Sequence, residues 1–332
     1  MSSLSVGDMA QTFTLTRSGS ALKTAIQQLS NELVSGLAED TAGHLSGDLG
    51  PLAGIQTSLA QLRGYKAVTT ETGLFTDAMQ AALGRITDMS ADLGQAVLAG
   101  ASPGASARIA ALGVDAAQKF EASVAALNIR VGDRSLFAGD ATTTMPLPTG
   151  ADLLDTLETV VAGAVSASDV QTALDDWFAS PAGYAAAYSG GDALAGVAVA
   201  PGEIARFDIT ALDPAIRDTL KGLAMTALID RNVLANNPQE RADLIRRSGE
   251  SLLATQSDLG ALAGRLGTAQ AQIDQAAQRN TAETTALNIA LSDLLSIDSF
   301  EVASRLQQTQ TQLETLFALT SRMSRLNLVN FL

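Results

Sequence analysis

A seven-residue repeat of mostly apolar side chains in the C-terminal third constrains the fold more than any other feature of the sequence. A sustained repeat of this length keeps one face of a helix turned toward a partner helix. Asn280 is the polar position of the repeat, and it either fixes the register or marks a point where the seam opens to water. The pattern therefore predicts a long coiled-coil-like helix. Its main positions are Leu252, Leu259, Leu266, Ile273, Asn280, Leu287 and Leu294, and its companion positions are Thr255, Leu262, Ala269, Ala276, Ala290 and Ile297, with Glu283 as the exception.

Two capping patterns indicate where the helices of this region begin. Asn237 can cap the first helix, Pro238 would occupy its first turn, and Glu240 would complete a capping box. The segment from Asp298 to Glu301 has the pattern of a second capping box, so a new helix is expected near residue 298. The seam of this last helix would include Leu306, Leu313, Leu316, Met323 and Leu326.

The N-terminal segment offers a matching apolar face. Leu15, Leu22 and Leu29 are seven residues apart, and Ile26 and Leu33 fill the alternate positions. Isolated helices of this kind are marginal in water because a helix gains most of its stability from packing its apolar face. Neither terminal helix can bury that face alone, so we expect the first segment to pair with the last.

The prolines separate helical ends from a looped centre, because residues 1–50 and 239–332 contain none. Further helices are predicted over about 50–100 and from Ile109 to near Gly132, with a restart at Asp213-Pro214. Residues 139–212 hold four prolines and the only tryptophan. For this segment we expect short helices over 152–164 and 169–178, and strands over 197–200 and 203–210.

These patterns predict a mainly α fold. A long antiparallel helical bundle or coiled coil is formed by the N- and C-terminal segments, with a small mixed α/β inserted domain. The expected domains are the terminal helices (1–36 plus 298–332), a helical bundle domain (37–138 plus 213–297) and a variable inserted outer domain (139–212).

Charge and cysteine content exclude several classes of function. The net charge is −14 and no long Lys/Arg cluster exists, so neither nucleic acid nor an anionic membrane surface is an expected partner. The absence of cysteine rules out disulfides and Cys-ligated zinc. The sequence contains no run of 18 apolar residues, so no membrane insertion is predicted. The N-terminus lacks the charged and apolar regions of a signal peptide. The chain is expected to be cytoplasmic or exported by a signal-less route.

Residues that could carry chemistry are few. His44 is the only histidine and is expected in a solvent-exposed glycine-rich loop, so neither a Ser-His-Asp triad nor a histidine metal site is supported. Gly260, Gly264 and Gly267 resemble a phosphate-binding rhythm, but they fall within the heptad helix and favour close approach of another helix over a simply weakened one. We predict no enzyme activity, no cofactor and no metal. The one concentration of aromatic and acidic residues that an enzyme could use is Asp175, Asp176, Trp177, Phe178, Tyr184 and Tyr188.

Three segments of the sequence have patterns that resemble those of one known family. Residues 27–36 are similar to the N-terminal flagellin motif, a helix that ends in Ser-Gly. Residues 134–140 are similar to the Arg-aromatic-Leu-Phe-Ser/Ala-Gly segment of the hook–filament junction branch, with Ser135 in place of the aromatic and the motif residues Leu136, Phe137, Ala138 and Gly139. Residues 306–332 resemble the C-terminus of that branch, with Phe317 where Tyr is common and Asn330 where Asp is common. The usual acidic motif after Ser-Gly is replaced in residues 37–43.

The resemblance to the bacterial flagellins and their hook-associated relatives covers roughly residues 1–138 and 213–332 and implies a structural role in the bacterial flagellum. Such a protein joins the hook zone to the flagellin filament. It is exported unfolded by the type III route without a cleaved signal peptide, and it assembles outside the cell as a ring through packing of its terminal helices. The implied partners are another hook-associated protein, flagellin and further copies of the chain, and an export chaperone is compatible. The expected assembly interface comprises Leu15, Leu22, Ile26, Leu29, Leu33, Leu306, Leu313, Leu316, Met323 and Leu326.

Other classes of protein remain open at this point. Flagellin itself, the filament subunit, has the same architecture and export route, although the Leu-Phe-Ala-Gly segment and the Phe-Leu ending argue against it. A type III secretion tip or translocator protein is also helical with paired ends, but usually lacks that segment. An enzyme built on a coiled-coil platform is the third alternative.

Overall fold

The computed structural model describes residues 6–100 and 105–329, without the side chains of residues 6–9, 11, 12 and 323–329. The chain forms two compact units. Unit 1 comprises Met1–Leu62 and Ala282–Leu332, and unit 2 comprises Arg63–Thr281. Long helices dominate both units, and the strands among the described residues form two small two-stranded sheets. The predicted mainly α fold class is confirmed.

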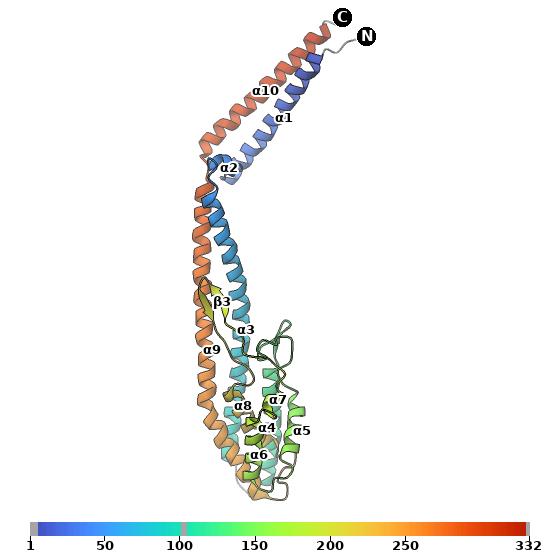
Figure 1. Cartoon of the computed structure of the whole chain (residues 1–332), viewed down its shortest axis with the longest axis vertical. Helices are drawn as coiled ribbons and strands as arrows, with labels where there is room; N and C mark the ends of the chain where they lie inside the picture. The colour runs from blue at the N-terminus through green and yellow to red at the C-terminus, as the bar shows by residue number, and fades with distance from the viewer. Residues whose placement is uncertain (1–5, 101–104, 330–332) are drawn as a thin grey trace. The chain divides into compact units, whose positions relative to one another are not determined.

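Unit 1 is built around a pair of terminal helices. Helix α1 (Val6–Ser35) lies beside α10 (Ser299–Val329), and the two run in opposite directions (Figure 1). A Cβ atom placed on Gly19 would lie 3.4 Å from Cδ2 of Leu316, and the Lys23 ammonium lies 5.6 Å from the centre of the Phe317 ring. The expected pairing of the first segment with the last is therefore present. The short helix α2 (Thr41–His44), the start of α3 (Gly50–Gly100) and the end of α9 (Pro238–Leu295) complete unit 1.

The starts of α9 and α10 follow from their caps. Asp298 Oδ1 accepts hydrogen bonds from the amides of Phe300 (2.9 Å) and Glu301 (3.2 Å), so α10 begins at Ser299 as predicted. Asn237 Oδ1 accepts a bond from the amide of Glu240 at 3.4 Å, and α9 begins at Pro238. The predicted role of the Glu240 side chain is wrong. Its carboxylate instead accepts a bond from the amide of Ala167 at 2.7 Å, at the start of α6 (Ala167–Ala179).

In unit 2, α3 and α9 lie side by side and antiparallel (Figure 1). Cross-helix hydrogen bonds join Gln256 Nε2 to Ser90 Oγ and Gln270 Nε2 to Asp77 Oδ1, each at 2.8 Å. The heptad seam is buried from Leu252 through Asn280 and becomes half-buried at Leu287 and Leu294, where α9 has entered unit 1. The coiled-coil prediction for this helix is thus confirmed over the part that lies in unit 2.

Most of the rest of unit 2 shares one hydrophobic core with α3 and α9. It contains α4 (Ser106–Leu127), α5 (Gly150–Val160), α6, α7 (Tyr184–Ala187) and α8 (Pro214–Ala227). Leu154, Leu174 and Phe178 from the segment 139–212 belong to the same buried cluster as Phe120 of α4 and Leu220 of α8. Residues of the segment 139–212 thus pack with the helices that flank it. The domain boundaries expected at 139 and 212 stay a prediction.

Helix α4 ends earlier than its sequence pattern predicts. It stops at Leu127, because the side-chain amide of Asn128 pairs with the backbone of Leu147, through an Nδ2 bond to the carbonyl (2.9 Å) and an amide bond to Oδ1 (3.0 Å). The chain then forms a small antiparallel hairpin of β1 (Arg130–Val131) and β2 (Arg134–Ser135). Gly132 makes its turn with φ +62°, a conformation that favours glycine.

A second hairpin lies against α9. Strands β3 (Val197–Ala200) and β4 (Glu203–Ala205) pair antiparallel about the turn at Pro201-Gly202, and β4 ends well before Thr210. Val199 and Ala205 form a buried cluster with Ile273 of α9. Asn280 is 3% exposed, and its Nδ2 donates a 2.9 Å bond to the carbonyl of Val199. The polar seam residue is therefore a contact for the hairpin, and the alternative of a water-filled seam at this position is wrong.

Two local expectations need correction. A Cβ atom on Gly260, Gly264 or Gly267 would meet no heavy atom within 4 Å, so these glycines do not mark the close approach of another helix. His44 is exposed as expected, but it ends the short helix α2 instead of lying in a loop.

None of the described helices combines the length and apolar composition that crossing a bilayer requires.

Candidate assembly interface

The predicted assembly-interface residues whose side chains the structure describes belong to α1 and α10, which pack against each other. Leu15, Leu22, Ile26 and Leu29 are half-buried on α1, whereas Leu33 is 37% exposed. On α10, Leu306, Leu313 and Leu316 are half-buried. Met323 and Leu326 were predicted to continue this seam, but their side chains lie outside the described residues. A pair of helices can cover only one side of each apolar stripe, so this seam is covered in part.

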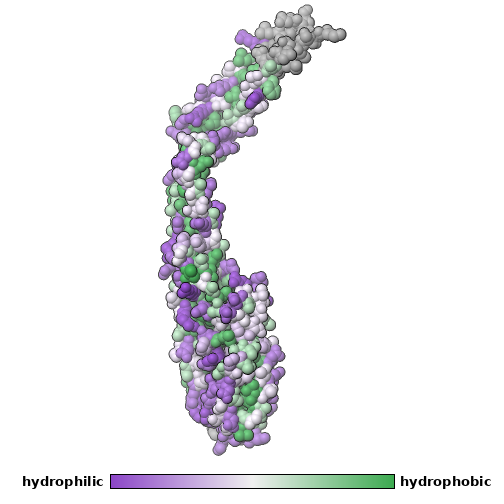
Figure 2. All heavy atoms as spheres, in the orientation of Figure 1, coloured by the Kyte–Doolittle hydropathy of each residue, from purple (hydrophilic) through white to green (hydrophobic). Residues whose placement is uncertain are grey.

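Other large apolar side chains of unit 1 face solvent. Val34 and Phe300 are more than four-fifths exposed, and Phe13, Phe317 and Leu319 are at least half exposed. Figure 2 shows apolar and polar residues interspersed along the coloured parts of α1 and α10. Scattered apolar residues are common on protein surfaces. Combined with a half-covered seam, they leave unit 1 with apolar area that burial against further helices would remove from water.

Backbone hydrogen bonds connect the two loops next to the terminal pair. We call these two loops, residues 35–40 and 295–298, the joint. The amide of Ala38 donates to the carbonyl of Leu295 at 2.9 Å, and the amide of Ile297 donates to the carbonyl of Gly36 at 3.1 Å. Leu37 and Ser296 form an isolated antiparallel bridge between the same segments. The loop that leaves α1 is therefore tied to the loop that enters α10.

The Leu-Phe-Ala-Gly motif lies inside unit 2 and not on its surface. Leu136 is 6% exposed, and Phe137 and Ala138 are fully buried. Backbone bonds of about 3 Å run from the amide of Ala211 to the carbonyl of Phe137 and from the amide of Gly191 to the carbonyl of Ala138. Gly139 has φ +61°, and a Cβ atom there would lie 2.2 Å from the carbonyl oxygen of Asp192. The motif therefore anchors two later chain segments to the core.

The aromatic cluster that an enzyme could have used is also core. The ring centres of Trp177 and Phe178 are 4.9 Å apart in an edge-to-face arrangement, and Tyr184 packs beside both. Burial raises the pKa of the Tyr184 phenol, whose hydroxyl donates a 2.8 Å bond to the carbonyl of Ala211. Asp175 forms an ion pair with Lys221 at 2.6 Å. These contacts account for the cluster by packing and hydrogen bonding.

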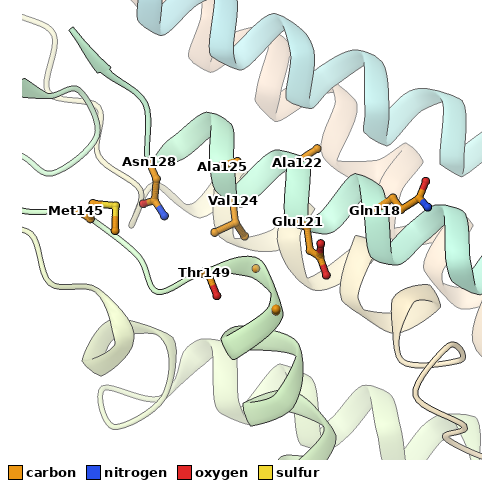
Figure 3. A pocket seen from close by; sticks show the side chains of 10 residues that line it. Gln118, Glu121, Ala122, Val124, Ala125, Asn128, Met145 and Thr149 are labelled. Atoms are coloured by element: carbon orange, nitrogen blue, oxygen red, sulfur yellow. The ribbon is translucent and has the colours of Figure 1, made fainter. Parts of the chain in front are cut away.

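An open pocket of about 650 Å³ lies between α4 and the start of α5. Figure 3 shows its lining side chains spread along α4 and the segment that leads into α5. The amide of Asn128 is engaged by the backbone of Leu147, and the Thr149 hydroxyl donates to Asp152 at 2.6 Å. Gln118 and Glu121 are exposed. The polar groups of the pocket do not converge on one point, and the described residues contain no cluster of His, Asp or Glu that could hold a metal ion.

Comparison with known protein families gives a match for the C-terminal part of the chain. Residues 253–332 match the model of the bacterial flagellin C-terminal helical region, which corresponds to the later part of α9 and α10. No match is found among the curated proteins.

Two solved structures are similar at low identity. One is a Vibrio parahaemolyticus protein provisionally described as a flagellar hook-associated protein, with 14% identity, a TM-score of 0.46, and coverage of 73% of this chain and 95% of that one. The other is FlgL of Bacillus cereus, with 12% identity, a TM-score of 0.32, and coverage of 74% and 100%. The matched region includes α10, which holds one side of the half-covered seam, and in this C-terminal helical region the chain is similar to the bacterial flagellins.

Proposed function

We propose that this protein is a structural component of the bacterial flagellum that joins the hook zone to the flagellin filament. The observation that carries the proposal is the match to the flagellin C-terminal helical region, whose last helix in this chain, α10, pairs with α1 along a partly covered seam. In an assembled ring, copies of the terminal pair would complete each other's apolar cover. The buried Leu-Phe-Ala-Gly motif, which resembles that of the junction branch, favours this role over the filament subunit.

The route and the partners belong to the same proposal. The chain would leave the cell unfolded by type III export without a cleaved signal peptide and act outside the cell. It would contact another hook-associated protein on one side, flagellin on the other and its own copies around the ring, and an export chaperone would be compatible. A structural role of this kind requires no catalytic site.

A substitution in the seam tests the assembly step. Leu313→Asp places a charge on the half-buried face of α10, where leaving a carboxylate unpaired and away from water is unfavourable. We expect the variant to be made and exported while cells are non-motile and shed filament subunits into the medium. Unit 2, followed by the fluorescence of its Trp177, should unfold at the wild-type midpoint because Leu313 lies in unit 1.

Gln312→Asp is the matched control, since it adds the same charge one residue away at an exposed position. This variant should swim. Normal swimming of the Leu313→Asp strain would contradict assembly through the terminal pair.

Deletion of the whole gene separates the junction role from that of flagellin. Electron micrographs of cells lacking a junction protein should show hooks without filaments, with flagellin present in the medium. If the medium instead lacks the major filament subunit, the chain is itself flagellin and the junction role is wrong.

A further inference from the structure

Glu32 is a buried acid at the end of α1. Its side chain is the carboxylate nearest to the joint on that helix, and the residue is 8% exposed. Oε1 accepts a 3.0 Å bond from the backbone amide of Glu39 and a longer one, 3.4 Å, from Gln28 Nε2. Removing a carboxylate from water is costly unless hydrogen bonds compensate for the lost solvation. The bond to the amide of Glu39 joins the last turn of α1 to the far end of the loop that leaves it, so it fixes the position of that loop.

The loop folds back onto α1 around this carboxylate. Gly36, with φ +74°, ends the helix, and its amide donates to the carbonyl of Glu32 at 2.8 Å. Further along, Asn31 Nδ2 donates to the carboxylate of Glu39 at 3.3 Å. Glu39 is therefore held to the last turn of α1 through its amide and through its side chain.

The residues between these two anchors are the ones that contact the other half of the joint. Gly36 and Ala38 provide the carbonyl and the amide that bind Ile297 and Leu295. With Gly36 fixed by the helix end and Glu39 fixed by Glu32, the intervening backbone is held against the segment before α10. The stability of these two backbone bonds depends on the Glu39 anchor, because a free loop would have to lose conformational entropy to form them.

We propose that Glu32 is a positioning residue that locks the joint, so that the segment before α2 and the segment before α10 open and close together. The lock is a property of unit 1 in the single chain and goes beyond the proposed role in the flagellum. Loosening it from the α1 side should release the backbone on the α10 side, although Glu32 has no hydrogen bond to that segment.

Hydrogen exchange of the full-length chain tests this lock. In Glu32→Ala the Glu39 amide loses its acceptor, and we expect exchange in peptides covering 37–40 and 295–298 to speed up roughly three- to tenfold, the effect of losing one net hydrogen bond. Glu32→Gln keeps an acceptor oxygen of the same reach and should retain most of the protection. Exchange of unit 2 should stay unchanged in both variants.

Glu39→Ala is the matched control, because it removes an exposed carboxylate from the same loop and leaves the backbone amide in place. It should change exchange at 295–298 little. In Glu32→Ala, faster exchange at 37–40 together with an unchanged exchange rate at 295–298 would overturn the coupling. A Glu32→Gln variant that behaves like Glu32→Ala would overturn the acceptor mechanism, and a general acceleration that includes unit 2 would show that Glu32 stabilises the chain without locking the joint.

Discussion

At the scale of single residues, glycines with the same backbone angle have different roles. Gly132 and Gly139 both have φ near +61°, but only Gly139 lies against another segment, with the carbonyls of Gly191 and Asp192 in the space a side chain would need. The sequence motif could be recognised from its residue types. The reason for its glycine depends on a loop some fifty residues later, which the local pattern does not contain.

Gly139→Ala should therefore destabilise unit 2 strongly. A Cβ atom at 2.2 Å from a backbone oxygen forces the segment at 191–192 to move, in addition to the strain of a positive φ, so we expect a loss of about 2–4 kcal/mol. Gly132→Ala, which meets nothing within 4 Å, should lose only about 1 kcal/mol from strain. Denaturant unfolding followed by Trp177 fluorescence measures both. Equal losses would show that close approach at Gly139 is unimportant.

Acid titration should reveal the contribution of Asp243. A hydrogen bond from Arg247, helped by one from Arg246, holds the pKa of Asp243 below its ordinary value of 3.8. A carboxyl whose folded-state pKa is lowered contributes stability above its unfolded-state pKa, and that contribution is lost as the pH falls through the folded-state value.

The Asp243→Asn variant should be less stable by about 0.5–1 kcal/mol at pH 7, a modest value because the ion pairs are partly exposed. The difference from wild type should shrink below about pH 4. Asp258→Asn, at an exposed site on the same helix, serves as the control. A difference that is constant from pH 7 to pH 2 would contradict the ionic origin.

At the scale of elements, the sequence predicted what local patterns determine. The heptads, Asn237-Pro238 and Asp298 were sufficient to place α9 and the start of α10. Local patterns failed where a distant group decides the outcome. Glu240 binds the amide of Ala167 instead of its own helix start, and α4 stops where Asn128 meets the backbone of Leu147. The partner of Asn280 is likewise a strand from another part of the chain.

The hairpin β3–β4 should depend on Asn280 for its place on α9. Asn280→Leu leaves the buried carbonyl of Val199 without this donor, which should cost about 1–3 kcal/mol. Hydrogen exchange of peptides covering 197–205 should accelerate. Asn288→Leu removes an exposed amide that bonds within α9, and it should leave the hairpin protected. An unchanged hairpin in Asn280→Leu would assign its placement to apolar packing alone.

At the scale of the whole molecule, the two units differ in how their helix seams are covered. In unit 2 the α3–α9 seam is fully buried, and the hairpin adds cover at Ile273 and Asn280. In unit 1 the α1–α10 seam is only half-buried. The sequence predicted both seams from the same periodicity but gave no sign of this difference, because periodicity identifies the face that a helix buries and not the number of neighbours that bury it.

Removing residues 140–211 should test how far unit 2 depends on that segment. Leu154, Leu174 and Phe178 fill the same core as Phe120 and Leu220, so a short linker in their place would leave α4 and α8 without much of their apolar cover. We expect thermal unfolding by circular dichroism to lose its cooperative transition. A sharp transition near the original midpoint would establish 139–212 as a separate domain.

The antiparallel pairing of α3 with α9 has a consequence for the order in which the chain can fold. The bond between Gln270 and Asp77 joins positions 193 residues apart, and the Asn280–Val199 bond adds a second long closure. Contacts between distant positions slow folding because the intervening chain must be ordered before they form. A chain that emerges N-terminus first, from a ribosome or a narrow conduit, must therefore hold α3 without its partner helix until most of the sequence has emerged. Unit 2 can close only after α9 has followed.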